Sequence, residues 1–435
     1  MIIKKLLLAL CSLLAFITPH AQNYPYQSDV LWVTAPDHPN WLYQLNEEAK
    51  ITVSLFEYGI LQDNLEIYYS IGPEMMPSEK TGTAMLKNSQ AVISIGTMSQ
   101  PGFKDCQLKV SLNEKEYKHH IKVGFEPEKL TPYTEFPNDF VSFWKKAKAD
   151  ADECPMKLEK TFAPEYSNDL VDCYLVKLQA YKKGSYVYGY LTLPKKGGKY
   201  PVVFSPPGAG IKPMNPLKDL FYAESGFIRF DMEIHGIRPN LDAETYKEVS
   251  QAFGNGNNSY LVNGLENRDS YYMKKVYLAC LRALDYLTTL PEWDGKNLIV
   301  QGGSQGGALA LVTAGLDERV TACAANHPAL SDMAGYKAGR AGGYPHLFTN
   351  YEGMDTPEKL KTLEYYDVVN FAKRINVPVF MTWGYNDNVC PPTTSYIVYN
   401  ILNCEKEALI TPVNEHWISL TARHQILDWI KQNLR

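Results

Sequence analysis

A short glycine-rich segment carries the residue type and spacing most suited to covalent chemistry. Residues 302–307 read Gly-Gly-Ser-Gln-Gly-Gly and contain the pattern Gly-x-Ser-x-Gly, in which a serine stands on a strained turn between a strand and a helix. The apolar run 298–300 before it and the Ala- and Leu-rich run 308–312 after it are typical of such a strand and helix. We therefore expect Ser304 to be a nucleophile. The alternative is a glycine-rich turn whose serine only caps the helix.

A histidine near the end of the chain is placed where a base would be needed. A serine hydroxyl attacks only when a base removes its proton and an acid orients that base. His416 follows the strand-like run 408–410 and precedes an expected final helix over residues 418–434. We therefore predict His416 as the base. The other histidines downstream of the serine are His327, which could flank the pocket, His346 and His424.

Asp387 is the expected acid. Residues 383–387 read Trp-Gly-Tyr-Asn-Asp, so that a strand ends, a glycine turns the chain and the aspartate is presented. The order serine, acid, histidine is the order of the α/β-hydrolase fold. Asp355 and Asp367 are weaker candidates because both precede the strand-like run 378–380. In isolation, Asp387 would equally suit a turn in which its side chain bonds the backbone.

The tetrahedral intermediate of acyl transfer needs two backbone N–H donors for its oxyanion. The amide of Gln305, directly after the nucleophile, is the first candidate. The second should come from a loop after an early strand, and the Pro-Pro-Gly-Ala-Gly segment 206–210 follows the apolar run 202–204. We predict the amide of Ala209 as this donor, against the alternative of a plain proline-glycine turn.

The elements that must position these residues alternate between strand-like and helix-like patterns after about residue 170. The apolar runs 186–193 and 201–205 read as strands, and residues 272–287 repeat apolar side chains at helical spacing. This alternation predicts an α/β domain with a mostly parallel sheet flanked by helices. We assign residues 127–435 to it.

The first part of the chain has a different pattern. Residues 50–56, 65–71 and 91–95 alternate polar and apolar side chains, as half-buried strands do, and Gly, Pro, Asn and Ser separate such runs. Short strands at this spacing, without a helical pattern, predict an immunoglobulin-like β-sandwich. We assign residues 23–126 to this domain, and the prolines that follow it suit a linker.

Residues 1–22 have the pattern of a secretory signal peptide. Lys4 and Lys5 precede an apolar run from Leu6 to Ile17, and Ala21 offers a small residue at a cleavage site. An apolar run of this length is too short to cross a bilayer, which takes about 20 residues. We therefore expect a secreted or periplasmic protein whose mature chain is not inserted in a membrane.

The composition argues against several classes of function. The formal net charge is −5, which gives no basis for binding nucleic acid. No two of the eight cysteines form a Cys-x-x-Cys pair, so a zinc site is not suggested, and most cysteines should be small buried side chains. His119 and His120 lie near an expected strand end and are interpreted as solvent-facing polar residues rather than metal ligands.

Several of these segments, taken in order, resemble the family of acetyl xylan esterases and cephalosporin C deacetylases. The resemblance covers roughly residues 130–435. It is carried by Pro-Asn-Asp-Phe at 137–140, Tyr-Gly-Tyr-Leu at 188–191, Ser-Tyr-Tyr at 270–272, Gly-Ser-Gln-Gly-Gly at 303–307 and Pro-Pro-Thr-Thr at 391–394. The resemblance implies an α/β-hydrolase fold and the same triad and oxyanion donors: Ser304, Asp387, His416, Gln305 and Ala209.

The resemblance also implies the reaction and its requirements. It implies deacetylation of small acetylated sugars through an acyl-enzyme, without cofactor or metal. We therefore expect an esterase that removes acetyl groups from acetylated xylan or other acetylated oligosaccharides. Two alternatives are a serine hydrolase of another ester or amide, such as a peptidase or general carboxylesterase, and a non-catalytic carbohydrate-binding protein. Members of the family often form hexamers, so a homo-oligomer is possible, although the additional N-terminal domain could block that assembly.

The sequence departs from the family pattern at two places. Residues 233–238, after the strand that contains Asp231, read Glu-Ile-His-Gly-Ile-Arg where the family usually has an Arg-Gly-Gln stretch. Trp417 follows His416 where the family usually has a glutamate, and Glu415 precedes it. These differences bear on which substrate is used and on which oligomer forms, more than on the chemistry of the triad.

Overall fold

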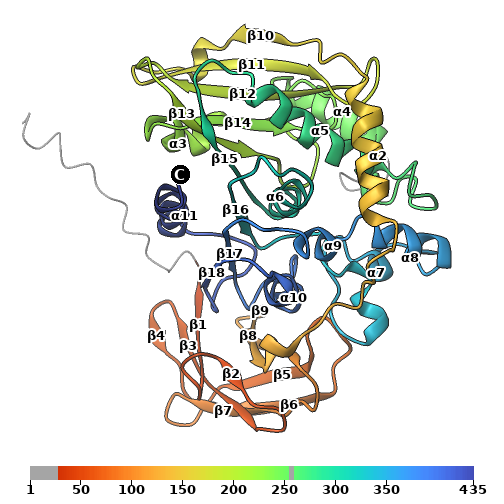
Figure 1. Cartoon of the computed structure of the whole chain (residues 1–435). Coiled ribbons are helices and arrows are strands. Elements are labelled where there is room, and N and C mark those ends of the chain that lie inside the picture. The colour runs from red at the N-terminus through yellow and green to blue at the C-terminus, as the bar shows by residue number, and fades with distance from the viewer. Residues whose placement is uncertain (1–27, 254–258) are drawn as a thin grey trace, which may run out of the picture.

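The computed structural model describes residues 28–253 and 259–435, so the expected signal peptide over residues 1–22 lies outside the described residues. Within these ranges the chain forms a β-sandwich followed by a layered α/β unit (Figure 1). Among the helices in these ranges, none is long and apolar enough to cross a bilayer.

The β-sandwich has a four-stranded and a five-stranded sheet. In the first, β3 pairs with β1, β4 and β7, and the second has the order β2-β9-β8-β5-β6. All pairs are antiparallel except β2 with β9. The strands are β1 (Val30–Pro36), β2 (Leu42–Tyr43), β3 (Ala49–Glu57), β4 (Ile60–Leu61), β5 (Glu66–Pro73), β6 (Lys80–Met85), β7 (Ala91–Gly96), β8 (Gly102–Leu112) and β9 (Lys115–Phe125).

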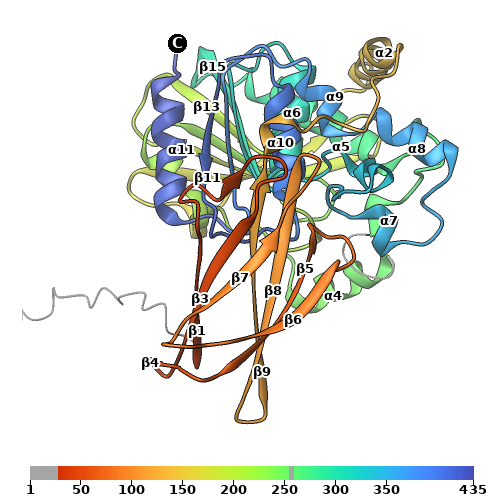
Figure 2. The same cartoon turned by 90° about the horizontal axis from the view of Figure 1, so that it is seen from below.

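The alternation of side chains along these strands separates a core from an outer face. On β9, Ile121 and Val123 point into the sandwich core, where both are fully buried, while Lys122 between them points the opposite way. Yet Lys122 is also fully buried, because the outer face of the five-stranded sheet packs against the α/β unit. Figure 2 shows this sheet reaching from the sandwich towards α10.

The α/β unit is built on a nine-stranded sheet with the order β10-β11-β12-β14-β13-β15-β16-β17-β18. The neighbours from β14 to β18 are parallel, and β10, β11 and β12 pair antiparallel at one edge. The α/β-hydrolase class expected from the sequence is confirmed. The strands are β10 (Glu159–Phe162), β11 (Val171–Gln179), β12 (Tyr186–Pro194), β13 (Tyr200–Ser205), β14 (Ile228–Glu233), β15 (Trp293–Gly303), β16 (Ala322–Asn326), β17 (Val379–Trp383) and β18 (Lys406–Ile410).

Helices cover both faces of this sheet. Alternate residues of β15 pack in two different clusters, Val300 with α5 and α6 and Ile299 with α11, because successive side chains of a strand point to opposite faces. Figure 1 shows α3 and α11 on one side and α5, α6 and α10 on the other. The helices are α2 (Phe140–Asp152), α3 (Phe221–Glu224), α4 (Ala243–Ala252), α5 (Tyr272–Leu287), α6 (Gln305–Leu316), α7 (Leu347–Asn350), α8 (Pro357–Glu364), α9 (Val368–Ala372), α10 (Pro392–Ile401) and α11 (Leu420–Gln432).

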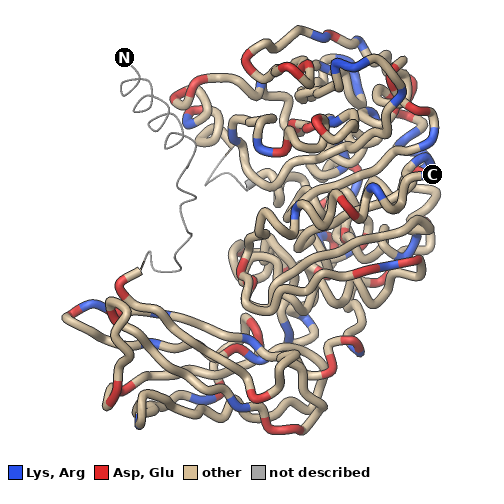
Figure 3. Tube along the Cα trace, turned by 90° about the vertical axis from the view of Figure 1, so that its left-hand side faces the viewer, with Lys and Arg blue, Asp and Glu red and all other residues tan. Residues whose placement is uncertain are grey.

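The two units share apolar contacts as well as polar ones. Phe103 of β8 is buried in the main core of the α/β unit, with its ring 5.0 Å from Tyr385 and 5.7 Å from Tyr396. Aromatic rings bury large areas, so this contact fixes the sandwich against the unit that follows it. Lys, Arg, Asp and Glu are interspersed along both units (Figure 3).

The cysteines lie as expected from the sequence, whereas two histidines of β9 do not. Cys106, Cys173, Cys280, Cys323 and Cys390 are buried and no cysteine of the described residues forms a disulfide, as expected for small core side chains. The expectation that His119 and His120 face solvent is wrong, because both lie within β9 and are half-buried. His119 stacks on Trp32, and His120 lies 3.3 Å from Asp105.

Candidate active site

Ser304 stands on the turn that joins β15 to α6. Its backbone has φ 59° and ψ −124°, a conformation that residues with a side chain rarely adopt. A Cβ on Gly302 would collide with the carbonyl of Gly306, and a Cβ on Gly306 would lie 2.5 Å from the carbonyl oxygen of Pro206. Only glycine fits at these two positions. The Ser304 amide donates to Asn326 O of β16 at 3.0 Å, which ties the turn to the neighbouring strand.

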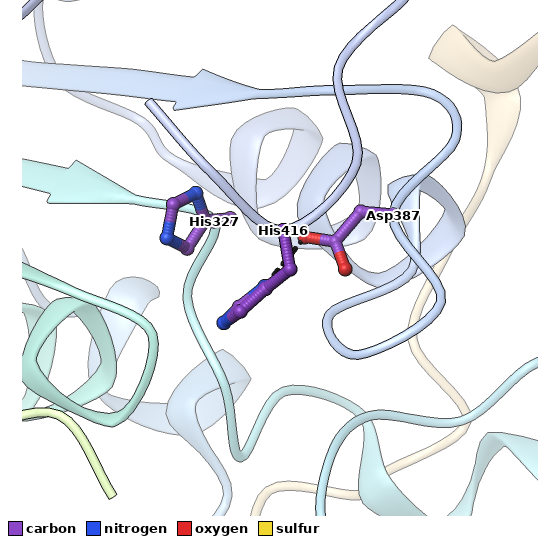
Figure 4. Close-up of side chains that lie close together, drawn as sticks. All are labelled: His327, Asp387 and His416. Carbon is purple, nitrogen blue, oxygen red and sulfur yellow. Dashed lines mark hydrogen bonds and ion pairs between the residues drawn. The ribbon is translucent and has the colours of Figure 1, made fainter. Parts of the chain in front are cut away.

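Ser304, His416 and Asp387 form one hydrogen-bonded chain. His416 Nε2 lies 3.1 Å from Ser304 Oγ, and His416 Nδ1 lies 2.8 Å from Asp387 Oδ2. A carboxylate can only accept, so Nδ1–H donates to Asp387 and Nε2 is left to accept the Ser304 hydroxyl proton. Figure 4 shows His416 between His327 and Asp387, with a dashed line that joins its ring to the Asp387 carboxylate. This is the arrangement that general-base activation of a serine requires.

Asp387 is held as a carboxylate by its surroundings. It is fully buried, and its Oδ1 accepts the backbone amides of Val389 and Cys390 at 2.7 and 2.9 Å. Burial alone would raise the pKa of Asp387, but the hydrogen bond and charge of His416 and the amide of Cys390 hold that pKa below its usual value. The carboxylate therefore stays ionised and can orient the imidazole.

The loops that carry Asp387 and His416 are joined to each other by their backbones. The Tyr385 and Asn386 amides donate to the carbonyls of Pro412 and Asn414 at 3.2 and 3.1 Å. A Cβ on Gly384 would collide with the Asn414 carbonyl, so only glycine allows this approach. These loops follow the adjacent parallel strands β17 and β18, which brings them to the same edge of the sheet.

A lysine of the β-sandwich contacts the acid loop from the other side. The Lys122 ammonium donates to the Asp387 carbonyl oxygen and to Glu74 Oε1, both at 2.7 Å, and the Lys122 amide donates to Asn386 Oδ1 at 2.9 Å. Lys122 and Glu74 are both buried, and Glu74 Oε2 accepts the Thr393 amide at 3.3 Å. Sequence reasoning missed this contact, because an isolated lysine in an alternating strand carries no signal of its partner.

The segment expected to complete the oxyanion hole lies against the serine turn. It follows β13, and the Pro206 carbonyl faces Gly306. The Gly210 amide donates to the Tyr260 hydroxyl at 3.4 Å, and this hydroxyl donates to Gln305 Oε1 at 2.5 Å. The Gln305 amide begins α6, where the first N–H groups have no acceptor within the helix. The roles of the Gln305 and Ala209 amides stay predictions.

His327 lies beside the base without belonging to the hydrogen-bonded chain. Its ring centre is 4.4 Å from that of His416, and burial lowers the pKa of His327 to about 4 (Figure 4). Ligand atoms of His327, Asp387 and His416 lie within 4.8 Å of one another, a spacing that a metal ion could use. However, Nδ1 of His416 and Oδ2 of Asp387 already bond each other, so a metal bound there would displace the proton that orients the base.

A cavity of about 660 Å³ opens beside the serine. Ser304, His416 and the 206–208 loop line it, together with Arg229 and Asp231. The Arg229 Nε donates to both carboxylate oxygens of Asp231 at 3.0 and 3.1 Å, so the buried guanidinium is paired. The volume falls in the range of small-molecule sites, roughly 300–1,000 Å³, and exceeds the needs of an acetyl group.

The other aspartates and histidines considered from the sequence do not belong to the triad, and several have structural roles. Asp367 caps α9 and accepts the Asp332 amide at 2.7 Å, and Asp355 pairs with Lys337 on the surface. His424 lies on α11 with its ring 5.1 Å from Phe221. The ring of His346 lies 3.1 Å from the Tyr336 hydroxyl.

Comparison with known proteins identifies the family. The model of the acetyl xylan esterase family matches residues 126–433, which begins directly after β9. The chain belongs to the acetyl xylan esterase family. A relative from Xylanibacter ruminicola, acetyl esterase Axe7A, is 56% identical over 434 residues, covering 99% of this chain and 97% of that protein. Family membership and this identity make the chain a serine carboxylic-ester hydrolase.

Solved acetyl xylan esterases share the fold of the second unit. The enzyme from Paenibacillus sp. R4 is 26% identical with a TM-score of 0.63, and the match covers 71% of this chain and 98% of that one. Acetyl xylan esterase 1 from Thermoanaerobacterium sp. JW/SL YS485 is 24% identical with a TM-score of 0.61 at the same coverage.

Proposed function

We propose that this member of the acetyl xylan esterase family removes acetyl groups from acetylated xylan or other acetylated oligosaccharides, with Ser304, His416 and Asp387 as its catalytic triad. The observation that carries the proposal is the continuous chain of hydrogen bonds from Ser304 Oγ through both ring nitrogens of His416 to Asp387. The names of the relatives, acetyl esterase and acetyl xylan esterase, support acetyl as the acyl group.

The first half of the reaction forms an acetyl-enzyme. His416 Nε2 takes the hydroxyl proton while Ser304 Oγ attacks the acetyl carbonyl carbon, and the carbonyl oxygen becomes an oxyanion. The amides of Gln305 and Ala209 are the proposed donors to this oxyanion. The bond between the carbonyl carbon and the sugar oxygen then breaks, and His416 gives its proton to that oxygen, which leaves as a sugar hydroxyl. Asp387 stabilises the imidazolium in both events.

The second half regenerates the serine. A water molecule takes the place of the sugar, His416 removes one of its protons, and the hydroxide attacks the acetyl-serine. The Ser304 oxygen leaves with the proton from His416, and acetate departs. The steps use the three side chains, the two proposed backbone amides and water, so the proposal includes neither a metal nor a cofactor.

The second candidate is a serine hydrolase of another ester or an amide, because the same triad serves peptidases and general carboxylesterases. Acyl size and leaving group separate these activities. An amide leaving group requires protonation of a nitrogen, and a long acyl chain requires an apolar channel, whereas the cavity beside Ser304 contains paired charges such as Arg229 and Asp231.

A substrate panel tests the proposal. Acetylated xylo-oligosaccharides, p-nitrophenyl acetate, a long-chain p-nitrophenyl ester and aminoacyl amides should be compared by kcat/KM, with acetate release measured for the sugars. We expect acetylated sugars and short acetate esters to be turned over and the other two to be poor substrates. Mass spectrometry of a stopped reaction should find the acetyl group on the peptide that contains Ser304. Efficient turnover of amides or long esters, without acetate release from sugars, would favour the second candidate.

The location and assembly of the protein belong to the same proposal. The signal pattern of residues 1–22 supports secretion or a periplasmic location, where a soluble acetylated glycan is accessible. Signal-peptide cleavage in a secreting host, followed by N-terminal sequencing, tests this. Light scattering of the purified protein tests whether it is a monomer or a homo-oligomer.

A further inference from the structure

A second cavity lies between the β-sandwich and the α/β unit and reaches the base of the triad. It has a volume of about 580 Å³, and we call it the interdomain groove. The α/β unit contributes Asn388, Glu415 and His416 to it. The sandwich contributes side chains from the outer face of its five-stranded sheet: Tyr68, Ser70, Gln107, Lys109, Lys118 and His120.

The register of the sheet arranges these side chains in two rows that run across three strands. Tyr68 of β5 is opposite Lys109 of β8, and Lys109 is opposite Lys118 of β9. Two residues along each strand, Ser70, Gln107 and His120 form the second row in the same way. Because residues i and i+2 of a strand point to the same face, both rows face the groove.

The second row joins the groove to the triad. His120 lies 3.3 Å from Asp105 through Nδ1 and 3.7 Å from Glu415 through Nε2, and Glu415 directly precedes His416. The first row lies further along the strands, and its aromatic member Tyr68 is 39% exposed with the Lys109 ammonium 5.3 Å from its ring centre. A ligand that begins at His416 would therefore pass hydrogen-bonding side chains first and an exposed aromatic ring afterwards.

Each lysine that lines the groove has a carboxylate partner, which favours a neutral ligand. Lys109 and Lys118 both bond Glu116, at 2.9 and 3.0 Å, and His120 lies between Asp105 and Glu415. A site for an anionic polymer would present cations without carboxylate partners. A sugar hydroxyl instead both donates and accepts, so it can bond to amide, carboxylate and ammonium groups alike, and a sugar ring presents an apolar face to an aromatic ring.

We propose that the interdomain groove binds the neutral oligosaccharide chain that carries the acetyl group, with sugars beyond the acetylated one passing over Tyr68. This rests on the proposed function and extends it, because it makes the N-terminal sandwich part of the substrate site. The departing alcohol takes its proton from His416. The sugar therefore leaves from the side of the ester next to His416, and the groove extends the site from that residue.

Comparing substrates of different length tests the proposal. Tyr68→Ala should lower the ratio of kcat/KM for acetylated xylotetraose to that for p-nitrophenyl acetate about tenfold, because the small ester does not reach Tyr68. The double variant Tyr68→Ala/Gln107→Ala should lower this ratio further. For the unaltered protein, KM should fall with each sugar added from acetylated xylose to xylotetraose, and Tyr68→Ala should flatten this trend. Tyr58→Ala is the matched control, since Tyr58 is 67% exposed in the turn between β3 and β4, outside the groove.

The outcomes separate the groove from the proposed function. If the unaltered protein deacetylates the sugars and Tyr68→Ala keeps the same ratio, the groove proposal is wrong and the esterase proposal stands. An equal fall in kcat/KM for both substrates, or the same change with Tyr58→Ala, overturns it as well. Preference for acetylated oligosaccharides that carry uronic acids overturns the assignment to a neutral chain. If no acetylated sugar is a substrate while p-nitrophenyl acetate is, both the groove proposal and the proposed function fail.

Discussion

The ammonium of Lys122 donates a hydrogen bond of 2.7 Å to the carbonyl oxygen of Asp387, although the two residues belong to different domains. Lys122 is a residue of the β-sandwich, and Asp387 is the acid of the proposed triad. The contact is buried and is completed by Glu74, which neutralises the ammonium. The N-terminal domain therefore supports the loop that orients His416, and Lys122 is expected to act as a positioning residue.

Lys122→Met should reduce both stability and kcat. Removing one member of a buried ion pair leaves Glu74 without its partner, which costs about 3–5 kcal/mol of unfolding free energy. The double variant Lys122→Met/Glu74→Gln leaves no buried charge and should regain most of this stability. Its kcat for p-nitrophenyl acetate should stay about tenfold low with little change in KM, because the Asp387 loop still lacks its hydrogen bond. Chemical denaturation and steady-state kinetics measure the two effects, and a double variant with normal kcat would show that Lys122 serves stability alone.

The triad makes the sharpest catalytic prediction. Ser304→Ala should lower kcat by roughly 10⁶-fold because it removes the nucleophile, and Asp387→Asn by roughly 10⁴-fold because it removes the carboxylate that selects the imidazole tautomer. Ser304→Ala should unfold at a temperature close to that of the parent protein. Asp355→Asn is the control, because Asp355 pairs with Lys337 on the surface. Full activity of Ser304→Ala would end the esterase mechanism proposed above.

His327 should make the protein less stable in acid. Burial lowers the pKa of His327 from 6.5 to about 4, so between these values the unfolded chain binds a proton that the folded protein does not. Above pH 6.5, His327 is neutral in both the folded and the unfolded chain, so it does not lower the unfolding free energy. As the pH falls from 6.5 towards 4, the unfolded chain binds the extra proton and the unfolding free energy decreases. On going from pH 7 to pH 5, His327→Gln should lose about 2 kcal/mol less than the parent protein. Urea titrations at both pH values check this, with His424→Gln, at an exposed position of α11, expected to behave like the parent.

Gly384 is predicted to be essential for the meeting of the acid and histidine loops. In Gly384→Ala the new methyl group collides with the Asn414 carbonyl, so the two loops must separate. We expect a loss of roughly 2–3 kcal/mol in unfolding free energy and a fall in kcat, since Asp387 and His416 move apart. Gly197→Ala is the matched control, because a Cβ there meets nothing within 4 Å. Equal stability of the two variants would contradict the prediction.

Local sequence patterns were sufficient to predict the main helices and strands of the α/β unit and the order of the serine, acid and histidine along the chain. The glycines around Ser304, the strand that precedes them and the loop position of His416 are features of a few neighbouring residues, and each is visible as composition or period. The helix expected over residues 272–287 coincides with α5, and the strand expected over 186–193 is β12. The parallel α/β class followed from the alternation of these patterns.

Contacts between the β-sandwich and the α/β unit could be seen only in the tertiary structure. Nothing near Lys122 in the sequence points to Asp387, which lies 265 residues further on, and an alternating strand only states that Lys122 faces away from the core. The half-buried state of His120 and the groove beside it exist because two domains pack together. The sequence by itself determined the residues capable of acyl transfer and the elements that present them, since spacing along a chain encodes local geometry. How the sandwich completes the site depended on the long-range packing of its outer face, which no local period encodes.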